Sequence, residues 1–310
     1  MRSAGEVLGG AGLLFLSAAA AAAVVGTGVG CNQLFGFENR VAGPTWCEED
    51  AQVSSSIYCD DFDRVSQVTQ HAQLQITLGG TVAVTNAESS SPPKSLLVTT
   101  TTGDAGTLVG TIATLGAVAA GQAVECQIDV PTADLAALAA AGPPVGIFGM
   151  GAEEGSASGA IDLLVVFLDP TEETVALERA TASAGAVAQQ GMACPIPGGL
   201  GVTQALGGPA GDQNGWVRLT MAVAPTDGGV PEGGCVLDSV ALAPTMDGGV
   251  APTMTVRLAA GPLAATNIYV PAQDFAAAEY FTYGLAFPVH TPASMVHVDN
   301  ARCQLIPSLP

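Results

Sequence analysis

The sequence predicts an all-β protein, a two-sheet antiparallel β-sandwich of the jelly-roll type with at most one or two short helices. Apolar and polar residues alternate in many short runs, Gly, Pro, Asn and Asp separate these runs, and helical periodicity is almost absent. Many short strands joined by turns are typical of sandwiches and jelly rolls. With 48% hydrophobic residues, the chain is not disordered by composition.

The first clear strands come early in the domain. Leu74, Ile76 and Leu78 alternate with polar residues, which is the period-two pattern of a strand buried on one face. The pattern repeats at residues 82–84, and the apolar run 96–98 leads into a threonine stretch. Each of these segments is predicted to be a strand.

The middle of the chain predicts two further strands and one helix. Apolar residues at 124, 126, 128 and 130 alternate with polar ones, as in a strand with one buried face. Residues 161–168 are nearly all apolar, which predicts a central strand covered on both faces. A short helix is predicted from Asp134 to Ala141, with Thr132 near its cap and the Gly-Pro-Pro of 142–144 ending it.

A three-strand meander is predicted from three runs, at residues 217–223, 235–242 and 254–258. The two connections repeat the phrases Ala-Pro-Thr and Asp-Gly-Gly. These phrases could also belong to a calcium-binding repeat. Hairpin turns built from residues that tolerate positive φ are the interpretation we favour.

The N-terminus predicts export. Residues 1–30 have a basic start, a long apolar stretch and small residues before Cys31, as in a signal peptide. The phrase Gly28–Cys31 resembles a bacterial lipobox, whose cysteine carries a lipid, although such boxes usually have Leu where Gly28 stands. A free thiol after ordinary cleavage and a retained anchor over residues 8–29 are the alternatives. We favour the lipid anchor, and Asn32 after it implies sorting to the outer membrane.

Beyond the anchor, residues 31–50 are predicted to be a tether and residues 51–310 one sandwich domain. Acidic residues outnumber basic ones 28 to 8, which gives a net charge of −20. Such a charge repels nucleic acid and anionic lipid head groups. The charge therefore excludes nucleic acid as a partner, and the expected partner is a membrane, through the N-terminal lipid.

Four phrases, at residues 58–64, 91–97, 216–220 and 296–302, together resemble the concanavalin A-like jelly roll, the superfamily of laminin-G-like modules and many secreted lectin or glucanase domains. In that family the opening "DDF" strand pairs with the closing "DN" strand. The resemblance covers residues 58–303, and it implies the fold and a sugar-binding face. A shared fold does not by itself assign a function.

Six cysteines follow Cys31, and an exported protein is expected to pair them: Cys47, Cys59, Cys126, Cys194, Cys235 and Cys303. They allow fifteen connectivities, between which the sequence does not decide. Cys47 and Cys59 flank a short polar stretch where related domains often carry a disulfide, so we expect that pair. For the other four we favour Cys194–Cys235 with Cys126–Cys303.

No catalytic residue is predicted. Retaining glucanases of the resembled fold carry two glutamates around an aspartate on one strand, because hydrolysis needs an acid and a nucleophile about 5.5 Å apart. The nearest phrase, Glu125–Asp129, lacks the second glutamate. A binding or structural role, with glycan recognition, is therefore our first hypothesis. A polysaccharide-acting hydrolase or lyase with a non-standard site, and an outer-membrane structural protein without a ligand, are the alternatives.

The candidates for ligand binding are Tyr269, Tyr280 and Tyr283, because exposed aromatic rings stack on sugars in such folds. Packing of these rings into the core is the competing interpretation, and we favour it. His297 shares a strand face with Asp299, which permits a metal or acid–base pair, although a surface histidine is the interpretation we prefer.

The resemblance also implies a structural calcium ion, held in some jelly rolls by an aspartate of the closing strand beside the opening strand. Asp299 matches that aspartate, and Asp61 lies among the carboxylates expected next to it. The alternative is that both side chains cap turns or accept hydrogen bonds from backbone amides, which we hold to be the better explanation.

Overall fold

The computed structural model describes residue 47 and residues 56–63, 74–77, 79–90, 94–115, 118, 122–153, 161–169, 174–183, 186–195, 215–226, 235–236, 253–260, 266–271, 278–307 and 309. They belong to a compact unit that runs from Pro44 to Pro310. The predicted signal peptide, Cys31 and almost all of the predicted tether lie outside the described residues. No helix in the described part of the chain is long and apolar enough to cross a membrane.

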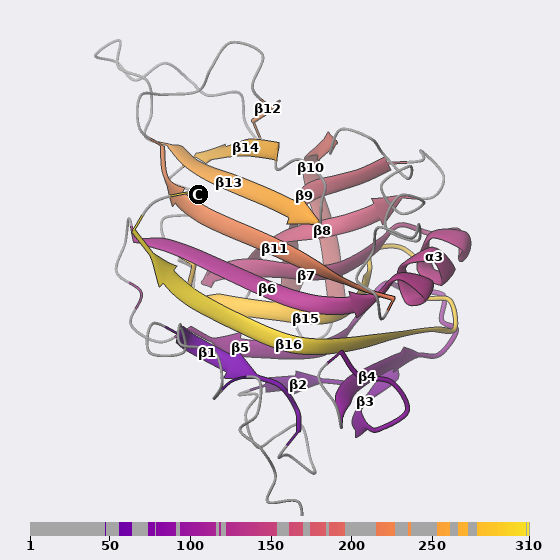
Figure 1. Cartoon of the computed structure of the whole chain (residues 1–310). Coiled ribbons are helices and arrows are strands. Elements are labelled where there is room, and N and C mark those ends of the chain that lie inside the picture. The colour runs from indigo at the N-terminus through magenta and orange to yellow at the C-terminus, as the bar shows by residue number, and fades with distance from the viewer. Residues whose placement is uncertain are drawn as a thin grey trace, which may run out of the picture. The chain divides into compact units, whose positions relative to one another are not determined.

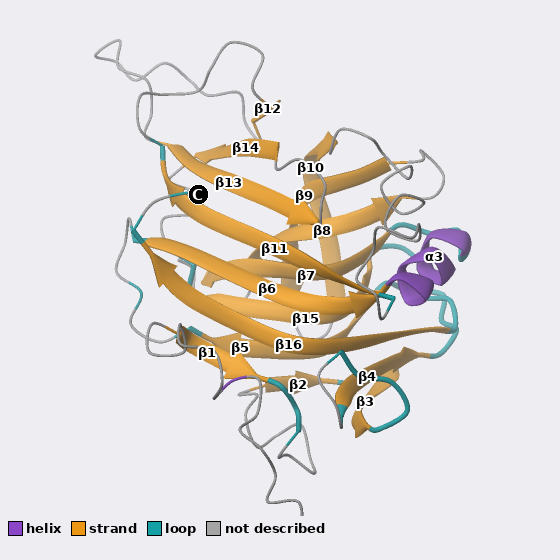
Figure 2. Cartoon of the chain, viewed as in Figure 1, coloured by secondary structure: helices purple, strands orange, loops and turns teal. Residues whose placement is uncertain are grey.

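The described residues form two antiparallel sheets, which lie face to face as a β-sandwich, and the predicted fold class is confirmed (Figure 1). Strands make up most of the structure and α3 (Thr132–Ala140) lies at one side of it (Figure 2). The nine-stranded sheet contains, in spatial order, β12 (Cys235–Val236), β14 (Thr266–Pro271), β13 (Thr253–Ala260), β11 (Trp216–Pro225), β6 (Ala123–Pro131), β16 (Ser294–Ile306), β4 (Ser95–Thr100) and β3 (Gly80–Thr85), with β1 (Ser56–Asp60) paired to β16. The seven-stranded sheet contains β10 (Ala186–Pro195), β9 (Thr174–Ser183), β8 (Ile161–Asp169), β7 (Val145–Glu153), β15 (Tyr280–Phe287), β5 (Thr107–Thr114) and β2 (Leu74–Ile76).

The core lies between the sheets, and sequence alternation decides which side chains enter it. The alternating apolar residues of β6 and β11 are all buried there: Val124, Cys126, Ile128, Val130, Val217, Leu219, Met221 and Val223. In β8, Leu164 and Val166 join this core, while Leu163 and Val165 join a second apolar cluster. Both faces of β8 are therefore covered, as its continuous apolar run predicts.

The opening and closing strands pair, as the resemblance implies. Asp60 of β1 lies opposite Ala301 of β16 in antiparallel register. Positive φ follows an aspartate on each strand, at Phe62 with 60° and at Asn300 with 50°. In both cases an aspartate stabilises the unusual backbone, because Asp60 accepts a hydrogen bond from the N–H of Phe62 and Asp299 accepts one from that of Asn300, where the register of β16 shifts.

Three disulfides join Cys47 to Cys59, Cys126 to Cys303 and Cys194 to Cys235. The expected pair and both favoured pairs are confirmed. Cys126 and Cys303 are direct cross-strand partners in β6 and β16, and both are fully buried in the core. This bond links the middle of the chain to its closing strand.

The predicted helix is confirmed, but the predicted meander is wrong. α3 begins at Thr132, and Gly142, with φ of +105°, follows its end. β11 pairs directly with β13, so no strand lies between them, whereas β12 pairs in parallel with β14 at the sheet edge. The first turn phrase begins where β11 ends, at Pro225, and the second, at residues 243–249, lies outside the described residues. Turn signals carry no information on which strand lies next in space.

Candidate functional site

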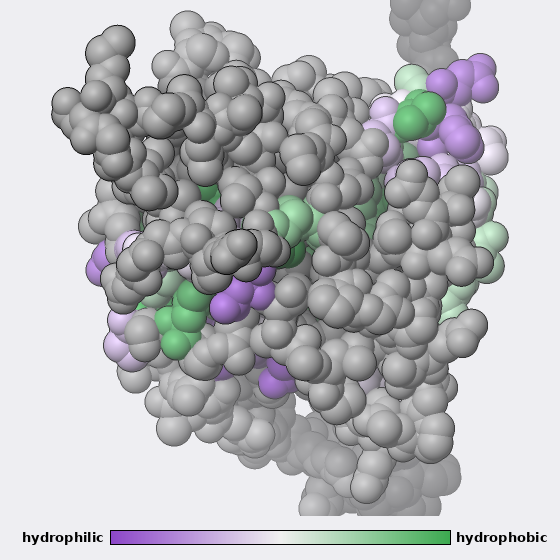
Figure 3. All heavy atoms as spheres, turned by 90° about the horizontal axis from the view of Figure 1, so that it is seen from above, coloured by the Kyte–Doolittle hydropathy of each residue, from purple (hydrophilic) through white to green (hydrophobic). Residues whose placement is uncertain are grey.

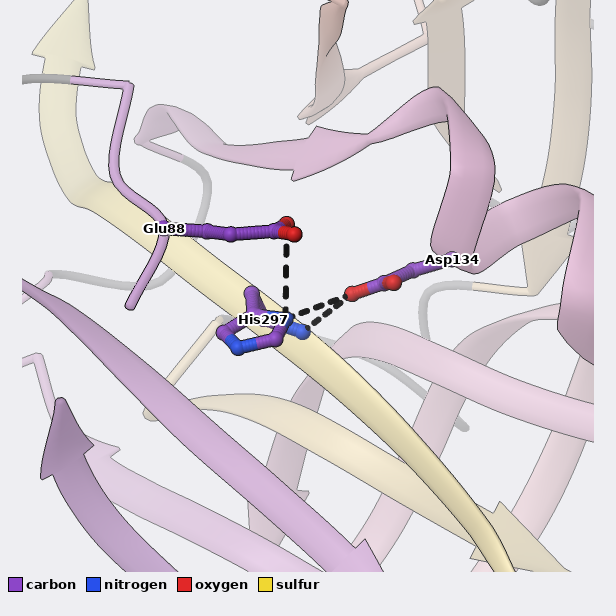
Figure 4. Close-up of side chains that lie close together, drawn as sticks. All are labelled: Glu88, Asp134 and His297. Carbon is purple, nitrogen blue, oxygen red and sulfur yellow. Dashed lines mark hydrogen bonds and ion pairs between the residues drawn. The ribbon is translucent and has the colours of Figure 1, made fainter. Parts of the chain in front are cut away.

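Three side chains from distant parts of the chain meet at His297: Glu88, Asp134 and His297 itself (Figure 4). The imidazole Nδ1 lies 2.9 Å from Oδ2 of Asp134 and 3.8 Å from Oε2 of Glu88. The backbone N–H of His297 donates a second hydrogen bond to the same Asp134 oxygen, at 2.7 Å. One ligand atom from each residue can be chosen so that all three lie within 4.8 Å of one another. Among the described residues, these three are the acidic, His or Cys side chains that lie close enough together to hold a metal ion.

Each residue of this cluster is placed by a different element. Val296 and Val298 of β16 face the core, so strand alternation turns His297 to the opposite face of the sheet. Asp134 lies in the first turn of α3, and its neighbour Leu135 is buried in the core and fixes that end of the helix. Glu88 lies in the connection between β3 and β4.

The cluster combines a buried pair with an exposed carboxylate. The side chains of His297 and Asp134 are 7% and 10% exposed, while that of Glu88 is 54% exposed. The hydrogen bond that the ring donates to Asp134 raises the pKa of His297 above its ordinary value, against the opposing effect of burial, and the charges of Asp134 and Glu88 add to the rise. The imidazole is therefore held by negative charge on two sides.

The connection that carries Glu88 is held in place at that residue and just after it. Ser95 Oγ donates a hydrogen bond to the backbone carbonyl of Glu88. Two residues further on, the N–H of Ser90 donates to Asp299 Oδ2 at 2.8 Å, and its hydroxyl lies 3.3 Å from Asp129 Oδ2. Because Asp129 and Asp299 are both buried, the position of this segment over the sheet is well defined.

Asp129 is the centre of this second polar group. Its carboxylate accepts hydrogen bonds from Nε and Nη2 of Arg218, at 2.8 and 2.9 Å, and from the side-chain amide of Asn300 at 2.8 Å. Arg218 lies directly opposite Asp129 across the β11–β6 pair. The group thus joins three strands on the face away from the core.

His297 differs from its sequence interpretation in two ways. It is buried, not a surface histidine, because α3 and the connection after β3 cover this part of β16. Its partner is Asp134 of the helix, while Asp299 accepts hydrogen bonds from backbone amides. The sequence placed Asp134 in the first turn of a helix but gave no sign that this helix crosses β16, and no motif marks Glu88.

The two carboxylates predicted to hold calcium both accept hydrogen bonds from backbone N–H groups. Asp61 accepts them from Cys47 and Asp63. Asp299 accepts them from Ser90 and Asn300. The calcium ion stays a prediction.

Because Asp299 is fully buried and accepts hydrogen bonds from two backbone amides, we expect Asp299→Ala to lower the free energy of unfolding by about 1–3 kcal/mol. We expect the same loss in calcium and in EDTA, measured by thermal melts. A stabilisation by calcium that Asp299→Ala abolishes would instead establish the ion.

The three tyrosines proposed for sugar stacking do not form an exposed strip. Tyr269 and Tyr283 are 7% and 1% exposed, and Tyr280 is partly buried. The hydroxyl of Tyr283 lies 2.7 Å from that of Tyr58, and burial raises the pKa of both phenols. Tyr283 also packs against Phe281, so it serves the core.

Seen from above, the described residues that reach the surface show hydrophilic and hydrophobic side chains in small neighbouring groups (Figure 3). The large hydrophobic side chains that are exposed within the described ranges are Val289 and Met295. Single exposed apolar residues of this kind are ordinary on protein surfaces. The cluster around His297 is therefore the feature that stands out chemically.

The chain matches no protein-family model and no curated protein sequence. Among solved structures it is similar to the "Cellulose induced protein, Cip1", at 16% identity and a TM-score of 0.38, over 73% of this chain and 85% of that one. It is also similar to the endo-1,3-beta-glucanase from Streptomyces sioyaensis, at 14% identity and a TM-score of 0.35, over 81% and 96%. A third similar structure is the PL-14 alginate lyase from Aplysia kurodai, at 9% identity and a TM-score of 0.36, over 73% and 87%.

Proposed function

We propose that this chain is an exported β-sandwich of the cell envelope, anchored to the outer membrane by a lipid on Cys31, which binds a glycan. The observation that carries the binding role is the cluster of Glu88, Asp134 and His297. There an exposed carboxylate is held in a defined position beside a buried His–Asp pair. Polar groups that converge on one point and carry a shifted pKa are typical of ligand sites.

The charge of the chain supports a neutral ligand rich in hydroxyl groups. A net charge of −20 repels anions, which disfavours nucleic acids and phosphorylated ligands. The carboxylate of Glu88 accepts hydrogen bonds, and sugar hydroxyls donate them. Three disulfides support an oxidising compartment outside the cytosol.

A polysaccharide-acting enzyme is the competing function, and Asp134 argues against it. A carboxylate that acts as nucleophile or general acid must present a free oxygen to the sugar. The Asp134 side chain is only 10% exposed, and its Oδ2 accepts two N–H groups of His297, so this carboxylate orients the histidine and presents little surface to a sugar. Glu88 then lacks the second carboxylate that glycoside hydrolysis requires.

The test is a glycan array probed with the purified full chain in detergent, in the presence of EDTA. We expect binding to a defined set of glycans, about tenfold weaker or more in Glu88→Gln, because that change removes the charged acceptor and leaves a neutral amide. Asp104→Asn is the matched control, since it removes one exposed carboxylate outside the cluster and should leave binding unchanged.

Two outcomes would contradict the proposal. If the wild-type chain bound no glycan, the glycan-binding role would be wrong, and the alternative of a structural protein without a ligand would be favoured. Release of new chain ends from a polysaccharide would establish the enzyme instead.

A further inference from the structure

We propose that Glu88, Asp134 and His297 bind a divalent transition-metal ion of the zinc class. The inference concerns the same cluster as the proposed function and goes beyond it, because an ion site here does not require a glycan. It rests on three observations: the geometry of the donor atoms, the hydrogen bond that orients Asp134, and the hydrogen bonds that hold the backbone at Glu88 and at Ser90.

The donor atoms already have spacings close to those of a metal site. Bonds from zinc to nitrogen and oxygen are about 2.1 Å long, so ligand atoms around a tetrahedral ion lie about 3.4 Å apart. Nδ1 of His297 lies 2.9 Å from Asp134 Oδ2 and 3.8 Å from Glu88 Oε2, on either side of that value. To reach that spacing, the His297–Asp134 separation has to widen by about 0.5 Å and the exposed Glu88 side chain has to approach by about 0.4 Å. Figure 4 shows the three side chains converging on this point.

Asp134 stays oriented when Nδ1 gives up its hydrogen bond. A metal-bound Nδ1 carries no proton and cannot donate to Asp134. The backbone N–H of His297 still donates to Oδ2 at 2.7 Å, and this contact does not depend on the tautomer of the ring. Hydrogen bonds of this kind hold metal-binding carboxylates in position.

Glu88 is an exposed residue on an anchored segment. Ser95 holds its carbonyl oxygen, and Ser90 is tied to the buried carboxylates of Asp129 and Asp299. The backbone that carries Glu88 therefore has little freedom to move away from His297. Pre-ordering of this kind reduces the entropy lost when a ligand binds.

The donor set selects the class of ion. Calcium and magnesium prefer oxygen ligands, and calcium takes six to eight of them. One imidazole nitrogen with two carboxylates suits zinc, and three protein ligands leave a fourth position for water or a ligand oxygen. A divalent ion also offsets the negative charge that the carboxylates of Glu88 and Asp134 bring together at this point.

The test is titration calorimetry of the purified full chain with zinc chloride, after treatment with EDTA and dialysis, with calcium chloride as a second titrant. We expect one saturable zinc site per chain, and affinity lowered about tenfold or more in Glu88→Gln because one of three ligands is lost. This variant is suitable because the Glu88 side chain is exposed and its loss leaves the core intact.

Two matched controls separate the site from non-specific binding. His290→Gln removes an exposed imidazole, and Asp104→Asn removes an exposed carboxylate, both outside the cluster. Both should keep wild-type zinc affinity. Equal affinity in Glu88→Gln and the two controls, or tighter binding of calcium than zinc, would overturn the proposal. Because glycan binding is measured separately in EDTA, a failed zinc site does not decide the proposed function.

Discussion

Loss of the Cys126–Cys303 disulfide is expected to lower the free energy of unfolding by about 5 kcal/mol, which is more than either other disulfide contributes. In the chain-entropy model a disulfide stabilises by restricting the unfolded chain, and the effect grows with the length of the closed loop. Cys126 and Cys303 are separated by 177 residues, against 41 for Cys194–Cys235 and 12 for Cys47–Cys59. Native proteins have a total stability of about 5–15 kcal/mol, so this loss is a third or more of the whole.

The measurement is urea denaturation of paired Cys→Ala variants, one pair at a time. We expect losses of about 5, 4 and 3 kcal/mol in the order of decreasing loop length. Removing both cysteines of a pair avoids a free thiol that could exchange with another disulfide. Equal losses for the longest and the shortest loop would contradict the entropic explanation, and peptide mapping that joins Cys47 to a cysteine other than Cys59 would contradict the connectivity itself.

The sequence predicted those strands whose side chains differ strongly between the two faces. β6 and β11 alternate apolar with polar residues, so their burial followed directly from the pattern. β8 was predicted for another reason, its continuous apolar run from Leu163 to Leu168. β9 and β10 are rich in Ala, Thr and Gln, and β7 contains several glycines. Ala and Gly have low strand propensity and give weak contrast between the two faces, so these strands carry little local signal.

The candidate site was harder to predict because its residues come from a loop, a helix and a strand. Sequence position puts Asp134 and His297 163 residues apart, and only the packing of α3 beside β16 joins them. Local periodicity determines which face of β16 carries His297, but not which element covers that face. The presence of disulfides was easier to predict, because export and an even number of cysteines imply them, but the sequence did not decide among the fifteen connectivities.

Replacement of Asp129 by alanine is expected to lower the free energy of unfolding by about 3 kcal/mol. Asp129 is buried, and its carboxylate accepts hydrogen bonds from Arg218, Asn300 and Ser90. Asn300 is itself buried, so its amide loses an acceptor that water cannot easily replace. An unsatisfied buried donor costs about 1–3 kcal/mol, and removal of one partner from a buried charged group costs about 3–5 kcal/mol.

Arg218→Ala provides the comparison, because the Arg218 side chain is 44% exposed while that of Asp129 is 5% exposed. After Arg218→Ala, the Asp129 carboxylate keeps its donors Asn300 and Ser90, and water can enter where the half-exposed guanidinium lay. We therefore expect Arg218→Ala to cost about 1 kcal/mol in the same urea titration. A cost equal to that of Asp129→Ala would assign the stabilisation to the ion pair and not to the buried amide and hydroxyl. The predicted difference follows from burial. When Asp129 is replaced, water can hydrogen-bond to the partly exposed guanidinium of Arg218, but it has little access to the buried side-chain amide of Asn300.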